Sequence, residues 1–365
     1  MRIAVLGVGL IGGSIGLAAR RRLGAEVVGF DPRPQNLERA LEVGALDTAA
    51  GSLEAAVDGA EVVFCAAPVA ALGELVTAAL EATPGGTVVS DVGSTKQALL
   101  AGVIGSAGEE RFIGGHPLAG AETAGVEGSR EDLFDGARWY LTPGPRSEGV
   151  LFERLRRLLA EIGARPLAID AASHDREMAT VSHLPHVLAN VLVSVAADSL
   201  GEEGDRRAEV GRSFRDAVRV AGANPAIWAD IYATNAEAVA AEIDAAGEGL
   251  RAAAELIRGG DVAALAAWQA GVGDERRRLL TEHVGAGELT ELLVAVENRP
   301  GTVAEIALAL GRAGVNIEDM SLFPAADRRT GAISLWIDGT EEADRAVAIV
   351  AALGHTVSTV SAGGS

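Results

Sequence analysis

Residues 3–31 read IAVLGVGLIGGSIGLAARRRLGAEVVGFD, and this stretch decides the fold of the first part of the chain. A short apolar run, Ile3–Leu6, is followed by a glycine-rich turn and a segment of helical composition. A second apolar run, Val27–Phe30, ends at the acidic residue Asp31. This order of strand, turn, helix, strand and acid predicts a βαβ unit that binds a dinucleotide at its first turn.

The turn between the first strand and the helix supplies three glycines with separate roles. Gly7 permits the tight turn, Gly9 lets the backbone approach a pyrophosphate, and Gly12 lets the helix pack closely on the strand. Leu10 and Ile11 open the helix, whose first turn offers free N–H groups to the phosphates. We therefore predict that these five residues bind the cofactor.

Asp31 indicates which dinucleotide is bound. It follows the glycine turn at about the 20-residue spacing expected of an acid that accepts both hydroxyls of the ribose. A carboxylate there repels a 2′-phosphate, so NAD is favoured over NADP. Arg33 lies two residues further on, and its cation keeps NADP open as an alternative.

Composition and charge exclude several classes of protein. The chain has 365 residues, 48% of them hydrophobic, and a net charge of −20, which argues against a nucleic-acid partner. No uninterrupted apolar run reaches the ~18 residues of a membrane span, and the start continues into a βαβ unit instead of a signal peptide. The single cysteine, Cys65, permits no intrachain disulfide. We expect a cytoplasmic protein without membrane contact.

Up to about Asp170, short apolar runs alternate with helical stretches. Near-continuous apolar runs are typical of parallel strands buried on both faces, so we predict an α/β protein whose residues 1–170 form a doubly wound Rossmann domain. The predicted strands are Ile3–Leu6, Val27–Phe30, Val62–Ala66, Thr87–Ser90, Phe112–Gly114, Trp139–Thr142 and Arg165–Ala168, with helices such as Pro34–Val43 and Glu148–Glu161 between them.

Residues 171–284 lack strand patterns and are rich in Ala, Leu, Glu and Arg. We predict an all-helical domain that binds substrate, and its apolar helix faces suggest a homodimer. The predicted helices are Ser173–Leu200, Asp205–Val220, Trp228–Arg258 and Asp261–Thr281.

After a linker at Gly285–Gly287, residues 288–361 return to alternating patterns in the order β-α-β-β-α-β. This order predicts a ferredoxin-like domain. Its predicted strands are Leu289–Glu297, Val315–Phe323, Gly331–Ile337 and His355–Val360, and its helices are Thr302–Ala313 and Glu341–Leu353.

Two polar residues follow strands of the predicted Rossmann sheet. Ser94 comes after Thr87–Ser90 and His116 after Phe112–Gly114, at the strand ends where ligands bind in such sheets. Hydride transfer to a nicotinamide needs a group that takes the hydroxyl proton, and histidine suits this near neutral pH. We predict His116 as a candidate catalytic residue, and Ser94 could form a hydrogen bond with the nicotinamide or the substrate. His116 could instead cap a turn. Lys96, two residues after Ser94, could be an exposed lysine at the start of a helix.

Further polar side chains occur in the helical domain. His183 and His186 are three residues apart and share a helix face. No third ligand stands at metal-binding spacing, so we predict no metal site and instead a role in orienting substrate or simple burial. Arg215 and Arg219 precede a helix break, where an arginine can hold a carboxylate through two hydrogen bonds or remain solvated.

Taken together, these motifs resemble the prephenate/arogenate dehydrogenase family. They cover about residues 1–283 in order: Gly7-x-Gly9-x-x-Gly12, Asp91-Val-Gly-Ser94-Thr-Lys96, Gly115-His116-Pro117-Leu-Ala-Gly120-Ala-Glu122, His174-Asp175, Ser182-His183-Leu-Pro-His186, Arg215-Asp216-x-x-Arg219 and Pro225-x-x-Trp228. The tail resembles an ACT domain, with Asn298-Arg-Pro300-Gly301 at its first turn and Gly314-Val-Asn316-Ile317 before its second strand.

The resemblance implies an NAD-dependent oxidative decarboxylation of prephenate to 4-hydroxyphenylpyruvate, the precursor of tyrosine. His116 would help remove the proton of the C4 hydroxyl as hydride leaves to NAD, and Ser94 would contact both the nicotinamide and that hydroxyl. The implied substrate-binding residues are Arg219, His186, His183, Arg215, Glu122 and Asp216. Among them Arg219 would bind a carboxylate of the dianionic substrate, so local cations would offset the negative charge of the protein.

The ACT resemblance implies feedback by an amino acid, most simply tyrosine. The implied effector residues are Asn298, Pro300, Gly301, Gly314, Asn316 and Ile317. A tail that only dimerises is the competing interpretation.

Three other functions are alternatives to prephenate oxidation. Arogenate is a rival substrate, and no single residue decides between it and prephenate. A β-hydroxyacid dehydrogenase would need a lysine in the helical domain, and residues 171–283 contain none. A non-catalytic, amino-acid-responsive regulator would have lost the polar residues that remain here, among them Ser94, His116, His186 and Arg219.

Overall fold

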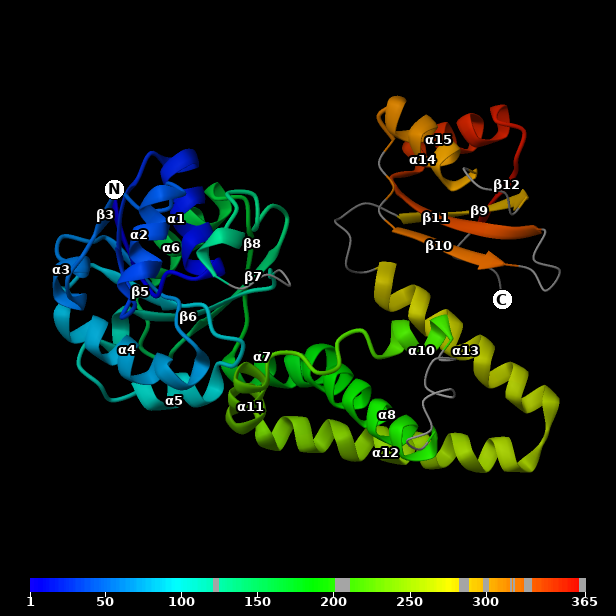
Figure 1. Cartoon of the computed structure of the whole chain (residues 1–365), viewed down its shortest axis with the longest axis horizontal. Helices are drawn as coiled ribbons and strands as arrows, with labels where there is room; N and C mark the ends of the chain where they lie inside the picture. The colour runs from blue at the N-terminus through cyan, green and yellow to red at the C-terminus, as the bar shows by residue number, and fades with distance from the viewer. Residues whose placement is uncertain are drawn as a thin grey trace. The chain divides into compact units, whose positions relative to one another are not determined.

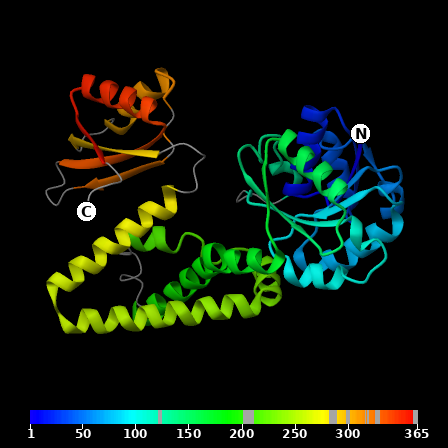
Figure 2. The same cartoon turned by 180° about the vertical axis from the view of Figure 1, so that it is seen from behind.

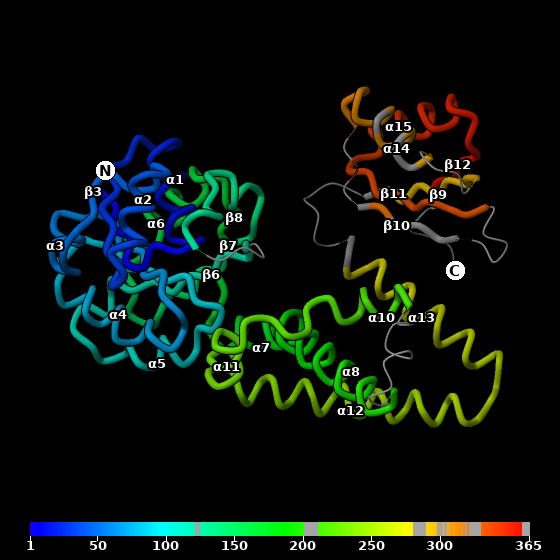
Figure 3. Tube along the Cα trace, viewed as in Figure 1, coloured from blue at the N-terminus to red at the C-terminus, as the bar shows by residue number. Residues whose placement is uncertain are grey.

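The computed structural model of the chain divides into two compact units, Met1–Leu250 and Arg251–Ser365 (Figure 1). It describes residues 1–120, 125–200, 211–281, 289–297, 302–315, 317, 319–324 and 330–360. Figure 3 shows the same trace coloured from blue at the N-terminus to red at the C-terminus. The first unit begins with a sheet domain and continues into helices, and the second ends in a smaller sheet domain.

An eight-stranded sheet organises the first part of the chain, in the order β3-β2-β1-β4-β5-β6-β7-β8. Its strands are β1 (Arg2–Leu6), β2 (Glu26–Phe30), β3 (Thr48–Ala49), β4 (Val62–Cys65), β5 (Val88–Asp91), β6 (Phe112–Pro117), β7 (Arg138–Pro143) and β8 (Arg165–Ala168). The order confirms the Rossmann prediction and adds the short edge strand β3.

The last two strands differ from the predicted parallel arrangement. Strand β7 is antiparallel to β6, with His116 opposite Tyr140, and β8 is parallel to β7. An apolar run shows that a strand is buried but carries no information on its direction, so this difference was not visible in the sequence.

Helices cover both faces of the sheet (Figures 1 and 2). Alternate residues of β1 point to opposite faces: Ile3 and Val5 join one core with residues of α1 and α6, whereas Ala4 and Leu6 join the other with residues of α3, α4 and α5. The helices of the sheet domain are α1 (Leu10–Leu23), α2 (Pro34–Glu42), α3 (Leu53–Val57), α4 (Val69–Ala82), α5 (Gln97–Val103) and α6 (Gly149–Glu161).

A long helical stretch follows the sheet, starting where the Asp170 side chain accepts a hydrogen bond from the Ser173 N–H. It comprises α7 (Ala171–Met178), a π-helical turn (Ala179–His183) and α8 (Leu184–Leu200). The helices after it are α10 (Arg212–Ala217), α11 (Pro225–Thr234), α12 (Ala236–Gly259) and α13 (Val262–Thr281). The single helix predicted over 228–258 is therefore wrong, because the chain breaks at Asn235.

The stretch Ala171–Leu200 is long and apolar enough to cross a membrane by length and composition, since an 18-residue window within it has a mean hydropathy of 1.3. Charged and polar residues interrupt its sequence, so it contains no uninterrupted apolar run of that length. Its first turns carry His174 and Asp175, which are buried within the protein, whereas Val191 and Val195 further along are half exposed. Several apolar side chains of α8 are therefore exposed on the surface of the chain.

The second unit ends in a four-stranded antiparallel sheet of order β10-β11-β9-β12. Its elements are β9 (Leu289–Glu297), α14 (Thr302–Arg312), β10 (Asp319–Pro324), β11 (Thr330–Asp338), α15 (Thr340–Ala352) and β12 (Thr356–Val360). This confirms the ferredoxin-like prediction, and residues of the sheet and both helices form one core.

Only part of the predicted effector site lies within the described residues. Gly314 follows α14 with φ +76°, a conformation that favours glycine, and Ile317 packs against the core of this domain. The predicted Asn298, Pro300, Gly301 and Asn316 lie outside the described residues.

Candidate active site

The glycine turn has the geometry that a dinucleotide requires. Gly7 has φ +96°, and a Cβ on it would overlap the carbonyl oxygen of Ala66. A Cβ on Gly12 would likewise overlap the carbonyl oxygen of Gly7. Around Gly9, by contrast, no atom lies within 4 Å of where a Cβ would be. The backbone at Gly9 is therefore open at the N-terminus of α1, where a pyrophosphate fits.

Asp31 completes this site at the end of β2 and is 6% exposed. Its Oδ2 accepts the Val8 N–H at 2.9 Å, and its Oδ1 accepts the Arg33 N–H at 2.9 Å. Each oxygen keeps a further lone pair for a ribose hydroxyl. The Arg33 side chain is mostly exposed, with its Nε 3.6 Å from Asp31 Oδ1. The residues present fit NAD.

A cavity of about 320 Å³ lies where polar residues of the sheet domain meet the helices. Three predicted site residues line it: Ser94, His116 and His183. The apolar part of its lining includes Met178, Trp228 and Ile231. The volume is within the range of small-molecule sites.

His116 lies on strand β6 and not in a loop after it, because β6 extends to Pro117 through pairing with β7. It is 9% exposed, and its Nδ1 is 2.9 Å from Nε2 of His174. Burial lowers the pKa of His116 well below its usual range, and the positive charge of Lys96 lowers it further. The ring is therefore a neutral base at physiological pH.

His174 continues this chain of contacts, with its Nδ1 2.8 Å from Oδ1 of Asp175. Both residues are fully buried. The sequence alone does not reveal these two residues as part of the site, because a His-Asp pair at the start of a helix is typical of a capping region. The contact between His116 and His174 spans 58 residues of sequence and depends on how α7 packs on the sheet.

Asp175 also holds the start of α5, since its carboxylate accepts the N–H groups of Lys96 and Gln97, each at 2.8 Å. Lys96 is 1% exposed and forms an ion pair with the buried Asp91. The alternative that Lys96 is an exposed lysine at the start of a helix is therefore wrong. The Asp91 carboxylate also accepts the N–H groups of Gly93 and Gly115. These bonds hold the Ser94 loop on one side and β6 on the other.

His183 forms the opposite side of the cavity and is 1% exposed. Its Nδ1 is 3.2 Å from Nδ2 of Asn235, and that amide also donates to the carbonyl oxygen of Asp175 at 2.7 Å. Burial lowers the pKa of His183 to about 4. The ring of His183 stands edge-on to Trp228.

His186 stacks on Trp228, with ring centroids 3.5 Å apart. Burial lowers the pKa of His186, and the charge of Arg219 lowers it further. Arg219 itself is exposed, as are Arg215 and Asp216. Asp216 is 3.6 Å from Arg212 on the same helix.

The substrate-binding roles predicted for Glu122 and Asp216 therefore stay predictions. Glu122 lies outside the described residues, and Asp216 has an ion pair with a residue other than Arg219. Among the described residues, no group of three or more His, Cys, Asp or Glu side chains is placed to hold a metal ion.

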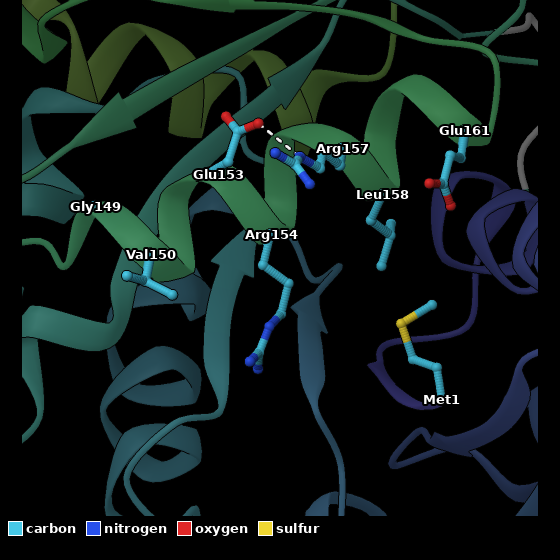
Figure 4. Close-up of a pocket in the computed structure, with 8 residues that line it drawn as sticks. All are labelled: Met1, Gly149, Val150, Glu153, Arg154, Arg157, Leu158 and Glu161. Atoms are coloured by element: carbon cyan, nitrogen blue, oxygen red, sulfur yellow. Dashed lines mark hydrogen bonds and ion pairs between the residues drawn. The ribbon is translucent and has the colours of Figure 1, made fainter.

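A larger surface hollow of about 610 Å³ lies along α6 beside Met1. Figure 4 shows the charged side chains that border it, with the ion pair of Glu153 and Arg157 marked. Both side chains are substantially exposed, at 39% and 71%. The hollow is thus an open surface feature, and none of the predicted site residues lines it.

A dinucleotide turn in the same sheet domain as a buried, neutral histidine that lines a small cavity defines an NAD-dependent dehydrogenase with a Rossmann domain. The chain belongs to the prephenate dehydrogenase family. The pattern of its nucleotide-binding domain matches residues 15–168, and the pattern of its dimerization domain matches residues 170–270. The ACT domain pattern matches residues 290–349.

Known relatives agree with this assignment. The chain is 29% identical to a prephenate dehydrogenase of Bacillus subtilis, over 94% of each chain. It is 31% identical to a cyclohexadienyl dehydrogenase of Zymomonas mobilis, over 66% of this chain and 83% of the relative. A crystal structure of Aquifex aeolicus prephenate dehydrogenase with hydroxyphenyl propionate and NAD+ is similar, with a TM-score of 0.71, 28% identity, and coverage of 76% and 98%.

Proposed function

We propose that the chain is a prephenate dehydrogenase, which oxidises and decarboxylates prephenate to 4-hydroxyphenylpyruvate. The observation that carries the proposal is His116, a buried neutral base that lines the cavity and is held by His174. NAD+, held by the Gly7–Gly12 turn and Asp31, supplies the hydride acceptor.

In this proposal each polar residue has a separate role in catalysis or substrate binding. His116 takes the proton of the ring hydroxyl, and Ser94 holds that hydroxyl in place. Once the hydroxyl has become a carbonyl, loss of CO2 from the ring restores aromaticity and makes the step irreversible. Arg219 and His183 bind the acidic groups of the substrate, which lowers the cost of holding a dianion in a protein of net charge −20.

Prephenate is proposed over arogenate because the relative that matches 94% of this chain bears that name. Arogenate remains the second candidate, since a further relative is named after the cyclohexadienyl ring that both compounds share. Absorbance at 340 nm, recorded with NAD+ and each compound in parallel, tests both. Faster reduction with arogenate would reverse the substrate assignment, and no reduction with either would overturn the proposed activity.

We further propose a cytoplasmic homodimer that is regulated through its ACT domain. The exposed apolar side chains of α8, such as Val191 and Val195, support self-association. Tyrosine is the simplest effector, because it is the end product of the reaction sequence. Tyrosine is titrated into the full chain and into a chain that ends at Thr281, and equal inhibition of both would remove this role from the tail.

A further inference from the structure

We propose that buried partner groups set opposite tautomers in the two histidines of the cavity. His174 and Asp175 leave His116 with an unprotonated Nε2, whereas Asn235 leaves His183 with a protonated Nε2. The cavity would then present one fixed proton acceptor and one fixed proton donor. The catalytic consequence rests on the proposed function, but the tautomers themselves do not.

The tautomer of His116 follows from the partners of Asp175. The carboxylate of Asp175 accepts two backbone N–H groups and has no proton to give, so Nδ1 of His174, 2.8 Å from it, must be the donor. A neutral His174 then has a lone pair on Nε2. Nδ1 of His116, 2.9 Å away, must donate to it. In neutral His116 the remaining lone pair is on Nε2.

The tautomer of His183 follows from the orientation of Asn235. The side chain of Asn235 lies 2.7 Å from the carbonyl oxygen of Asp175, which can only accept, so the atom that faces it is the amide nitrogen. The same nitrogen is 3.2 Å from Nδ1 of His183, which therefore accepts its second hydrogen. In neutral His183 the proton is then on Nε2.

Asp175 connects the two arrangements, since its carboxylate directs His174 and its backbone carbonyl directs Asn235. An acceptor on His116 suits removal of a hydroxyl proton, and a donor on His183 suits a substrate carboxylate or carbonyl oxygen. When His116 becomes protonated, its Nδ1–H keeps its acceptor on His174, which stabilises the cation. His174, Asp175 and Asn235 are positioning residues in this scheme.

Nitrogen-15 NMR of the histidine ring nitrogens of the full chain, at neutral pH and without substrate, tests the tautomers. We expect a protonated Nδ1 in His116 and a protonated Nε2 in His183. Asn235→Asp would replace the donor with an acceptor and should transfer the proton of His183 to Nδ1. The same tautomer in both histidines of the wild type would overturn the proposal, whatever the enzyme is found to oxidise.

Kinetics then test the effect on His116. His174→Leu removes the acceptor, whereas His174→Gln keeps an oxygen that can accept. We expect kcat to fall about 10- to 100-fold in His174→Leu, with a smaller loss in His174→Gln and an unchanged Kd for NAD+. Tyr140→Phe is the matched control, because Tyr140 touches the His174 ring edge-on without a hydrogen bond to it. Equal losses in all three variants would mean that His174 acts only through packing.

The pH profile separates positioning from packing. The titratable groups near His116 are His174 and Asp175 from α7, Lys96 from the loop before α5, and His183 from the π-helical turn. Without its acceptor, protonated His116 is less stable, so the acid limb of kcat/KM should move to lower pH in His174→Leu and move less in His174→Gln. An acid limb at the same pH in the wild type and both variants would contradict the positioning role of His174.

Discussion

The cavity has a sheet wall, which carries Ser94 and His116, and a helical wall, which carries His183. The two walls differ in how many of the side chains on and near them are buried with hydrogen-bond partners in the same chain. On the sheet side, Ser94 and His116 belong to segments that buried hydrogen bonds of Asp91 and Asp175 hold in place. On the helical side, His183 is equally buried, but outside the cavity lining Arg219 is exposed and α8 carries exposed apolar side chains. The polar residues of the sheet side are therefore fixed by contacts within one chain, whereas the helical side leaves charged and apolar side chains exposed.

The largest expected effect tests the sheet wall. His116→Asn should lower kcat by about 10²- to 10⁴-fold, because the general base is lost while the nucleotide turn is untouched. Turnover and the Kd for NAD+ are measured together. His186→Asn is the counterpart on the helical wall and should mainly raise KM. If His116→Asn weakened NAD+ binding as much as turnover, misfolding would explain the loss.

The next effect tests the helical wall. Arg219→Ala should weaken substrate binding by about 2 kcal/mol, or about 30-fold in KM, because a carboxylate loses its charged partner. Little change in kcat is expected. Arg212→Ala removes another exposed arginine close to Arg219 in sequence and should leave KM unchanged. An unaltered KM in Arg219→Ala would remove this residue from the substrate site.

The pH dependence of stability tests how firmly His183 is buried. Its pKa of about 4 in the folded chain lies below the value of about 6.5 expected when unfolded. Between these values the unfolded chain binds the extra proton, so the free energy of unfolding should fall as pH drops from 6.5 to 4, by about 1–3 kcal/mol from this residue. Urea denaturation of the wild type and of His183→Gln measures it. Identical slopes in both would show that His183 does not contribute.

The smallest effect concerns the cofactor. Asp31→Ala should relax the preference for NAD over NADP by about tenfold, since the carboxylate that repels a 2′-phosphate is gone. Ratios of kcat/KM for the two cofactors are compared. Asp31→Asn keeps an acceptor for the Val8 N–H and separates loss of charge from loss of that bond. A ratio unchanged in both variants would show that Asp31 does not select the cofactor.

Local sequence patterns predicted much of this molecule. The glycine turn, the predicted strands of the Rossmann domain and the β-α-β-β-α-β tail were visible because their signals lie within short segments of chain. Ser94 and His116 were visible because each follows an apolar run at a known edge of a sheet.

The direction of β7 and β8, the break at Asn235 and the burial of Lys96 were decided by the tertiary structure alone. So were the partners of the two cavity histidines, since His174 meets His116 across 58 residues and Asn235 meets His183 across 52. A motif specifies which residues can do chemistry. Which nitrogen of a histidine carries the proton depends on a neighbour that only the packing of distant elements brings within hydrogen-bonding distance.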